Sequence, residues 1–252
     1  MNAVTIAMIT FVCTYGCALA AAYLRDKLPP PHLTKESQDV VRLGMGLVAT
    51  MTALLLGIVT AAARSTFDAS TADVRTSAVN ILTLDRHLAR YGAETKPIRE
   101  LIIRAVAYRV EATWPAEGAS RKGYGEPLST PAVEEVENQI LQLSPQTDSQ
   151  RWFKSEALRL SNEVLKMRWR VLEGDSSLPQ TFLNVVIFWL MATFVSFGLY
   201  APRNATVLSV LLIAALSVAA AVFLIVELDG PFDGLIQVSG EPLRFALSNL
   251  GH

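Results

Sequence analysis

The chain has 252 residues, of which 51% are hydrophobic and only 18% are charged. In ordinary soluble domains about a quarter of the residues are charged, so this composition indicates a membrane protein. The 22 Lys and Arg residues are balanced by 23 Asp and Glu residues, which gives a net charge of −1. Because phosphate binding needs a concentrated basic surface, this balance argues against a nucleic acid as a partner.

Four stretches without any charged residue are each long enough to cross a bilayer, since about 20 apolar residues span the hydrocarbon core as an α-helix. They cover residues 2–24, 43–63, 176–202 and 204–226. The predicted fold class is therefore all-α, a polytopic membrane protein with a helical soluble domain between transmembrane helices 2 and 3. The predicted parts are transmembrane helices at about 4–24 and 43–63 (within 1–63), the soluble domain 64–181, transmembrane helices at about 182–200 and 207–228, and a C-terminal tail 229–252.

The soluble domain is predicted to be helical because its apolar residues recur every three or four positions. A helix over residues 66–91 is expected to prolong the second span. Proline is favoured at the first position of a helix, so Pro97 marks the start of the next one. Two further helices are expected to begin at Thr130 and Asp148, after a loop over residues 115–130 that is rich in glycine and proline.

The helix that begins at Asp148 carries apolar residues at a regular spacing of four and three positions. This spacing is typical of a seam along which one helix packs against another. The predicted seam consists of Phe153, Ala157, Leu160, Val164, Met167 and Val171.

Residue patterns typical of enzymes are missing from the sequence. It contains no phosphate-binding glycine loop, no nucleophile elbow and no HExxH pair. His87 is interpreted as part of a solvated helix face, because no second ligand stands at the spacing of a metal site. We therefore expect a protein that is not an enzyme and that needs no cofactor, unless it binds calcium at the acidic turn described below.

The second span carries a stripe of small or hydroxyl-bearing residues with an arginine at each end. We call it the small-residue stripe; it consists of Arg42, Gly46, Thr50, Ala53, Gly57, Thr60 and Arg64. Small residues let membrane helices approach closely, and this common use favours a packing face. The same residues also suit a pore, because small side chains leave room and the arginines raise the local concentration of anions. Both interpretations hold if subunits pack around a common axis.

An acidic turn follows the fourth span, with Glu227 and Asp229 before Gly230-Pro231 and Asp233 after it. One interpretation is a turn at the membrane interface, where the cost of a charge is small. The other is a small site for a cation such as calcium, because carboxylates are the hard oxygen ligands that this ion prefers.

Four runs of the sequence resemble the bacterial bestrophin-like membrane proteins, and the resemblance covers nearly the whole chain. They are LGMGLVAT at 43–50, NILTLDR at 80–86, SFGLYAPRNAT at 196–206 and ELDGPF at 227–232. A looser similarity to bestrophins proper lies in the order of two spans, helical domain and two spans. It also includes the turn Pro231-Phe232-Asp233.

In bestrophins this arrangement implies a pentameric anion channel with a pore lined by the second span and a cytosolic middle domain. The acidic turn after the last span takes part in calcium binding in the animal members. Two features depart from that pattern. The consecutive acids of the calcium-binding turn are missing here, and the second span has neither the proline nor the aromatic residues of the bestrophin pore neck.

The resemblance leads us to expect a homo-oligomer in the lipid bilayer of the cell inner membrane that passes small anions along the second span. It also places the soluble domain and both termini in the cytoplasm, because the Lys and Arg residues near the span ends do not decide the orientation. The alternative is a non-conducting membrane scaffold or sensor that binds a partner through the seam of residues 153–171.

Overall fold

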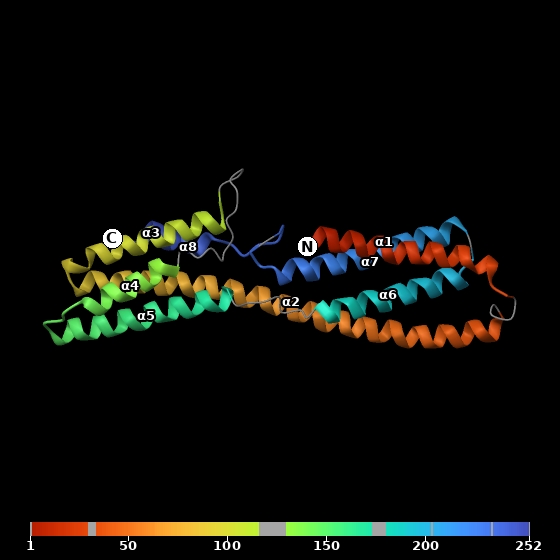
Figure 1. Ribbon diagram of the computed structural model, residues 1–252, viewed down its shortest axis with the longest axis horizontal. Coiled ribbons are helices and arrows are strands. Elements are labelled where there is room, and N and C mark those ends of the chain that lie inside the picture. The colour runs from red at the N-terminus through yellow and green to blue at the C-terminus, as the bar shows by residue number, and fades with distance from the viewer. Residues whose placement is uncertain are drawn as a thin grey trace. The chain divides into compact units, whose positions relative to one another are not determined.

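The structure, a computed structural model, describes residues 2–29, 34–115, 130–172, 180–202, 204–232 and 234–251 (Figure 1). All regular elements in these ranges are helical, which confirms the predicted all-α class. Two short 3-10 turns, Arg25–Lys27 and Ala93–Thr95, accompany the α-helices. The α-helices are α1 (Ala3–Leu24), α2 (Lys35–Tyr91), α3 (Lys96–Thr113), α4 (Thr130–Gln142), α5 (Asp148–Leu172), α6 (Gln180–Tyr200), α7 (Ala205–Asp229) and α8 (Glu241–Asn249).

Four helices are long and apolar enough to cross a membrane, as predicted. They are α1 with the 3-10 turn that follows it, α2, α6 and α7. The helix expected over residues 66–91 continues the second span without a break, because α2 runs from Lys35 to Tyr91. Most of the loop predicted over residues 115–130 lies outside the described residues, as do His32, Asp233 and His252.

The chain divides into two compact units, and α2 contributes to both. The first unit comprises Met1–Thr66, Ser176–Gly230 and Gly234–Ile236, and the second comprises Phe67–Asp175, Pro231–Asp233 and Gln237–His252.

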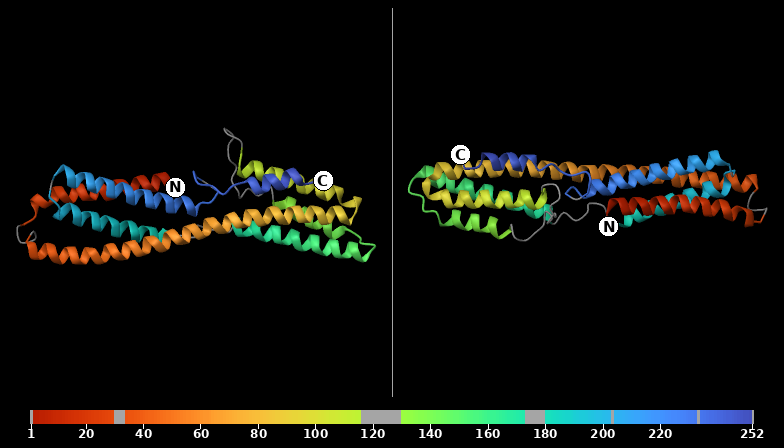
Figure 2. Two further views of the ribbon diagram at one scale, coloured as in Figure 1. Left: turned by 180° about the vertical axis from the view of Figure 1, so that it is seen from behind. Right: turned by 90° about the horizontal axis from the view of Figure 1, so that it is seen from above.

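In the first unit, α1 packs against both α6 and α7 (Figure 2, red, teal and blue). The fully buried positions of α1 are all small residues, Thr10, Thr14, Ala18 and Ala21, and the partly buried Phe11 and Tyr15 pack beside them. Opposite Ala18 stands Gly198 of α6, where an added Cβ would lie 2.8 Å from the carbonyl carbon of Ala18. The close approach that small residues allow therefore occurs on α1, where the sequence analysis did not place it.

In the second unit, one hydrophobic core joins α2, α3, α4, α5 and α8. The predicted seam on α5 forms part of it, since Ala157, Leu160 and Val164 belong to this core, and Met167 is buried as well. The hypothesis that this seam binds a partner is therefore wrong. Its apolar residues already pack against the chain's own helices, so exposing them would open the core.

The core of the second unit contains a buried ion pair. Asp85 of α2 is buried, and its carboxylate accepts hydrogen bonds from Nε and Nη2 of Arg99 on α3. The backbone N–H of Gly251 donates to the same carboxylate over 3.3 Å. This one side chain therefore ties together α2, α3 and the C-terminal end of the chain.

The C-terminal segment, which the sequence suggested as a tail, folds back into the second unit. Leu243, Ala246 and Leu250 on and after α8 are buried in its core. Nε1 of Trp114 donates to the carbonyl oxygen of Val238 over 2.8 Å. The segment is part of the folded unit and completes it.

His87 was assigned to a solvated helix face, and this interpretation is wrong. The imidazole is partly buried and lies 5.3 Å from the ring of Trp152 and 5.7 Å from that of Phe153, measured between centroids. It serves as an aromatic packing residue between α2 and α5.

Candidate pore helix

The small-residue stripe on α2 is solvent-exposed at all seven of its positions in the single chain. A Cβ added at Gly46 or Gly57 would meet no atom within 4 Å. The described part of the chain therefore does not cover the stripe. Among the described residues no helix covers these small side chains, so the space beside them is open to lipid, to another copy of the chain or to a pore.

The contacts that α2 makes within the first unit lie on a different face of the helix. Val59 and Ala63 are buried there and pack with Ile225 of α7. A third face carries bulky apolar side chains that are more than half exposed, at Leu43, Leu47, Leu54 and Ile58. Along the membrane span, α2 thus has three faces. One packs against α7, one carries exposed bulky side chains, and one carries the exposed small residues of the stripe.

The two threonines of the stripe use their hydroxyl protons within the helix. Thr50 donates to the carbonyl oxygen of Gly46 over 2.9 Å, and Thr60 donates to that of Leu56 over 2.7 Å. Neither hydroxyl therefore offers a hydrogen-bond donor to an anion beside the helix. Any attraction for anions along this face comes from Arg42 and Arg64 at its two ends.

A cavity of about 420 Å³ lies beside the Arg42 end of the stripe, within the first unit. It brings the stripe residues Arg42 and Gly46 next to the C-terminal half of α6, which contributes three hydroxyl-bearing residues. These are Thr193, Ser196 and Tyr200. The sequence analysis missed them, although their spacing of three and four positions in an apolar span was a usable signal.

The acidic turn has a structural role at Glu227. Its carboxylate is buried, and its Oε1 atom accepts hydrogen bonds from the backbone N–H groups of Leu235 and Ile236. Gly234 makes this possible, because its φ is +92° and a Cβ there would lie 2.7 Å from the carboxyl carbon of Glu227. Glu227 thus holds the turn after α7 in place.

The cation site predicted at Glu227, Asp229 and Asp233 stays a prediction. Asp233 lies outside the described residues, and Glu227 already accepts two hydrogen bonds from the backbone. Among the residues that the structure describes, no group of three or more His, Cys, Asp or Glu side chains has the arrangement to hold a metal ion.

The comparison with known families gives one match. The sequence model of the Bestrophin-like domain matches residues 12–243. No curated protein sequence matches the chain.

Solved structures with a similar fold include a bacterial bestrophin homologue from Klebsiella pneumoniae. It shares 16% sequence identity and a TM-score of 0.67 with this chain, over 97% of this chain and 96% of that one. A mutant bacterial bestrophin homologue from the same organism gives 15% identity and a TM-score of 0.68, over 99% and 97% of the two chains. At such low identity, the likeness shows a shared fold.

Proposed function

We propose that this chain, which belongs to the bestrophin-like family, assembles into a homo-oligomeric channel for small anions with a pore lined by the α2 stripe. The observation that carries the proposal is the exposure of all seven stripe residues in the single chain. A stripe of small residues that none of the described helices covers is suited to face a central axis.

The side chains on the stripe suit weak binding and rapid passage. The glycines and alanine leave space beside the helix, and the threonine hydroxyl protons are already bonded to backbone carbonyls. Conduction requires that an ion enter readily and leave readily, which strong binding along the path would prevent. Arg42 and Arg64 would attract anions to the two ends of the stripe.

The cavity beside Arg42 lies where we propose that anions enter the pore. Its lining combines one guanidinium with the hydroxyl-bearing residues Thr193, Ser196 and Tyr200. A positive charge at the edge of this hollow raises the local concentration of anions where the stripe begins.

Chloride flux into proteoliposomes tests conduction. The full chain should carry more chloride than empty vesicles do, and Gly57→Leu should reduce the flux several-fold by filling the space beside the stripe. Gly44→Leu is the matched control, because Gly44 is exposed on the same helix outside the stripe and a Cβ there also meets no atom within 4 Å. No flux from the wild-type chain, or equal losses in both variants, would refute a pore lined by the stripe.

A native mass measurement tests the assembly independently of conduction. The bulky exposed residues beside the stripe are suited to contact either lipid or another copy of the chain, and the measured mass decides whether copies associate. A monomer or a dimer would leave no bestrophin-type central pore and would exclude this kind of channel.

The orientation in the membrane is a further part of the proposal. By analogy with bestrophins, the second unit and both termini lie in the cytoplasm and the spans cross the cell inner membrane. A reporter fused after His252 that is active only outside the cytoplasm should stay inactive. An active reporter would reverse the orientation without affecting the proposal of conduction.

A further inference from the structure

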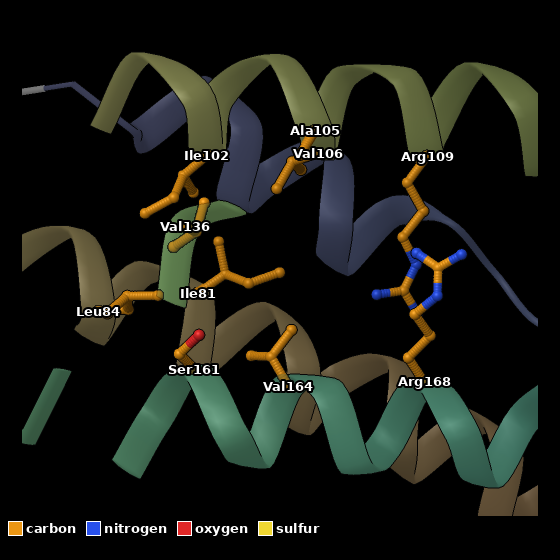
Figure 3. A pocket seen from close by; sticks show the side chains of 10 residues that line it. All are labelled: Ile81, Leu84, Ile102, Ala105, Val106, Arg109, Val136, Ser161, Val164 and Arg168. Atoms are coloured by element: carbon orange, nitrogen blue, oxygen red, sulfur yellow. The ribbon is translucent and has the colours of Figure 1, made fainter. Parts of the chain in front are cut away.

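Cavities of very different size lie in the two units. The smaller one, of about 50 Å³, lies in the core of the second unit, with Arg109 and Arg168 at one end (Figure 3). A buried water needs roughly 10–15 Å³ of such space, so this cavity has room for only a few waters. The cavity beside Arg42 in the first unit has about 420 Å³. Pockets of about 300–1,000 Å³ hold small molecules, so this second cavity, which we call the Arg42 cavity, has the size of a ligand site.

The charge in the Arg42 cavity comes from Arg42 itself. Its side chain is exposed, and none of the residues that the structure describes forms an ion pair or a hydrogen bond with its guanidinium. The ten described residues that line the cavity include no acid. The lining is therefore positively charged, and its guanidinium is available to an anionic ligand.

Two hydroxyl groups of α6 stand beside this guanidinium, one helical turn apart. Ser196 is only 8% exposed, and its hydroxyl makes no hydrogen bond within the described part of the chain. The same holds for the hydroxyl of Tyr200. A polar group that is buried without a partner is costly, so the position of Ser196 favours a ligand in the cavity that accepts its proton.

The end of α6 would by itself repel an anion, because the C-terminal end of a helix carries a partial negative charge. Arg25, which follows α1, offsets this effect. Its Nη1 atom donates to the carbonyl oxygen of Ala201 over 2.8 Å, and Ala201 lines the cavity. A second guanidinium thus lies next to the lining and occupies one of the carbonyl groups at the helix end.

The Arg42 cavity lies at the level of the lipid headgroups. Arg42 directly precedes the charge-free stretch 43–63, and Tyr200 is the last residue of α6. Tyrosine is enriched at the interface between membrane and water. From Arg42 and Tyr200 the lining continues into the spans as far as Ala49 and Thr193, which is about 10 Å at the rise of 1.5 Å per residue in a helix. The cavity therefore runs from the interface into the region of the acyl chains.

We propose that the Arg42 cavity binds the phosphate group of an anionic membrane lipid. Arg42 donates to the phosphate oxygens, because the fork of a guanidinium matches phosphate geometry. The hydroxyls of Ser196 and Tyr200 serve the same headgroup, and basic pockets between membrane helices are known to bind anionic lipids in this way. A lipid with a net negative charge is preferred over a zwitterionic one, because no acid in the lining accepts an ammonium group.

This inference goes beyond the proposed pore, because its ligand is a lipid and not a permeant ion. Where both proposals hold, a lipid phosphate beside Arg42 reduces the attraction of the pore entrance for chloride. The experiment below measures thermal stability and not flux, so a chain that conducts no chloride can still bind the lipid.

Thermal unfolding of the full chain in a non-ionic detergent tests the site. Phosphatidylglycerol or phosphatidylcholine with the same acyl chains is added at one fixed ratio of lipid to detergent. The Tm should rise by several degrees more with phosphatidylglycerol, because a ligand that binds only the native state stabilises it. Inorganic phosphate at constant ionic strength should give no comparable rise, because it has no acyl chains to fill the deeper part of the cavity.

Three variants locate the effect. Arg42→Met should lose most of the difference between the two lipids. Lys35→Met should keep it and is the matched control, because Lys35 is an exposed cation near the start of the same helix that does not line the cavity. Ser196→Ala should lose part of the difference, while its Tm without added lipid should not fall, because its hydroxyl has no hydrogen bond to a described residue.

Three results would overturn the proposal. The first is a wild-type Tm that responds equally to the two lipids. The second is an equal loss in Arg42→Met and Lys35→Met, which would show a general attraction between basic residues and a negatively charged micelle. The third is a rise with inorganic phosphate as large as that with phosphatidylglycerol, which would exclude the lipid as the source of the phosphate.

Discussion

Asp85 and Arg99 form a two-point ion pair inside the second unit, with Nε and Nη2 of the arginine donating over 2.7 and 2.9 Å to the two carboxylate oxygens. The hydrogen bond to the carboxylate raises the pKa of Arg99, so the guanidinium stays charged. The carboxylate side chain is 1% exposed and the guanidinium side chain is 16% exposed. Such a pair stabilises the fold mainly because neither partner is left buried alone.

Replacing Asp85 with alanine should therefore cost much more than replacing an exposed acid. Removing one partner of a buried pair leaves an uncompensated charge and costs about 3–5 kcal/mol. Asp148→Ala is the control, because Asp148 pairs with Arg151 at the surface, and exposed pairs contribute about 0–1 kcal/mol. Urea unfolding followed by circular dichroism measures both, and equal losses would contradict the role assigned to Asp85.

Substitution of the glycine on α6 should show how tightly α1 and α6 approach each other. Gly198→Ala would place a methyl group against the backbone of Ala18, and overpacking of this kind costs about 1–3 kcal/mol. Gly16→Ala, on α1, has open space around the added carbon and should be neutral or slightly stabilising, because alanine is the better helix former. The Tm of each variant in detergent gives the comparison. A Gly198→Ala variant as stable as wild type would show that the two helices can separate.

Removal of the Glu227 carboxylate should loosen the turn after α7. Glu227→Ala leaves the N–H groups of Leu235 and Ile236 without their acceptor, and a hydrogen bond to a charged group contributes about 1.5–3 kcal/mol. The loss in Tm should be the same with calcium and with a calcium chelator, because the contacts that disappear are hydrogen bonds to the backbone. A wild-type Tm that rises with calcium, with no such rise in Glu227→Ala, would instead support the predicted cation site.

The helices and membrane spans could be predicted from the sequence, because the spacing of apolar residues and the length of stretches without charge are local properties of the chain. Residues 66–91 continued the second span, and the helices beginning near Pro97, Thr130 and Asp148 are present. The short helix α8 was missed, since nine residues carry too little periodic signal, although Pro242 at its first turn and Leu243 and Ala246 at a helical spacing were available.

The sites were harder to predict, because they depend on which residues meet in space. Arg109 and Arg168 are unremarkable in the sequence and become a pair only when α3 packs opposite α5. The seam on α5 was identified correctly as a packing surface, but its partner turned out to be the chain itself. Periodicity shows that a helix face is buried, and it cannot show what covers that face.

Because α8 belongs to the core of the second unit, this core can be completed only at the end of synthesis. Residues 67–175 leave the ribosome well before α8, yet their core is closed by Leu243, Ala246 and Leu250. At about 5–20 residues per second, the growing chain must still synthesise both later spans before that closure. The second unit therefore waits in an incomplete state during synthesis, and it reaches its final fold only after α6 and α7 have been made.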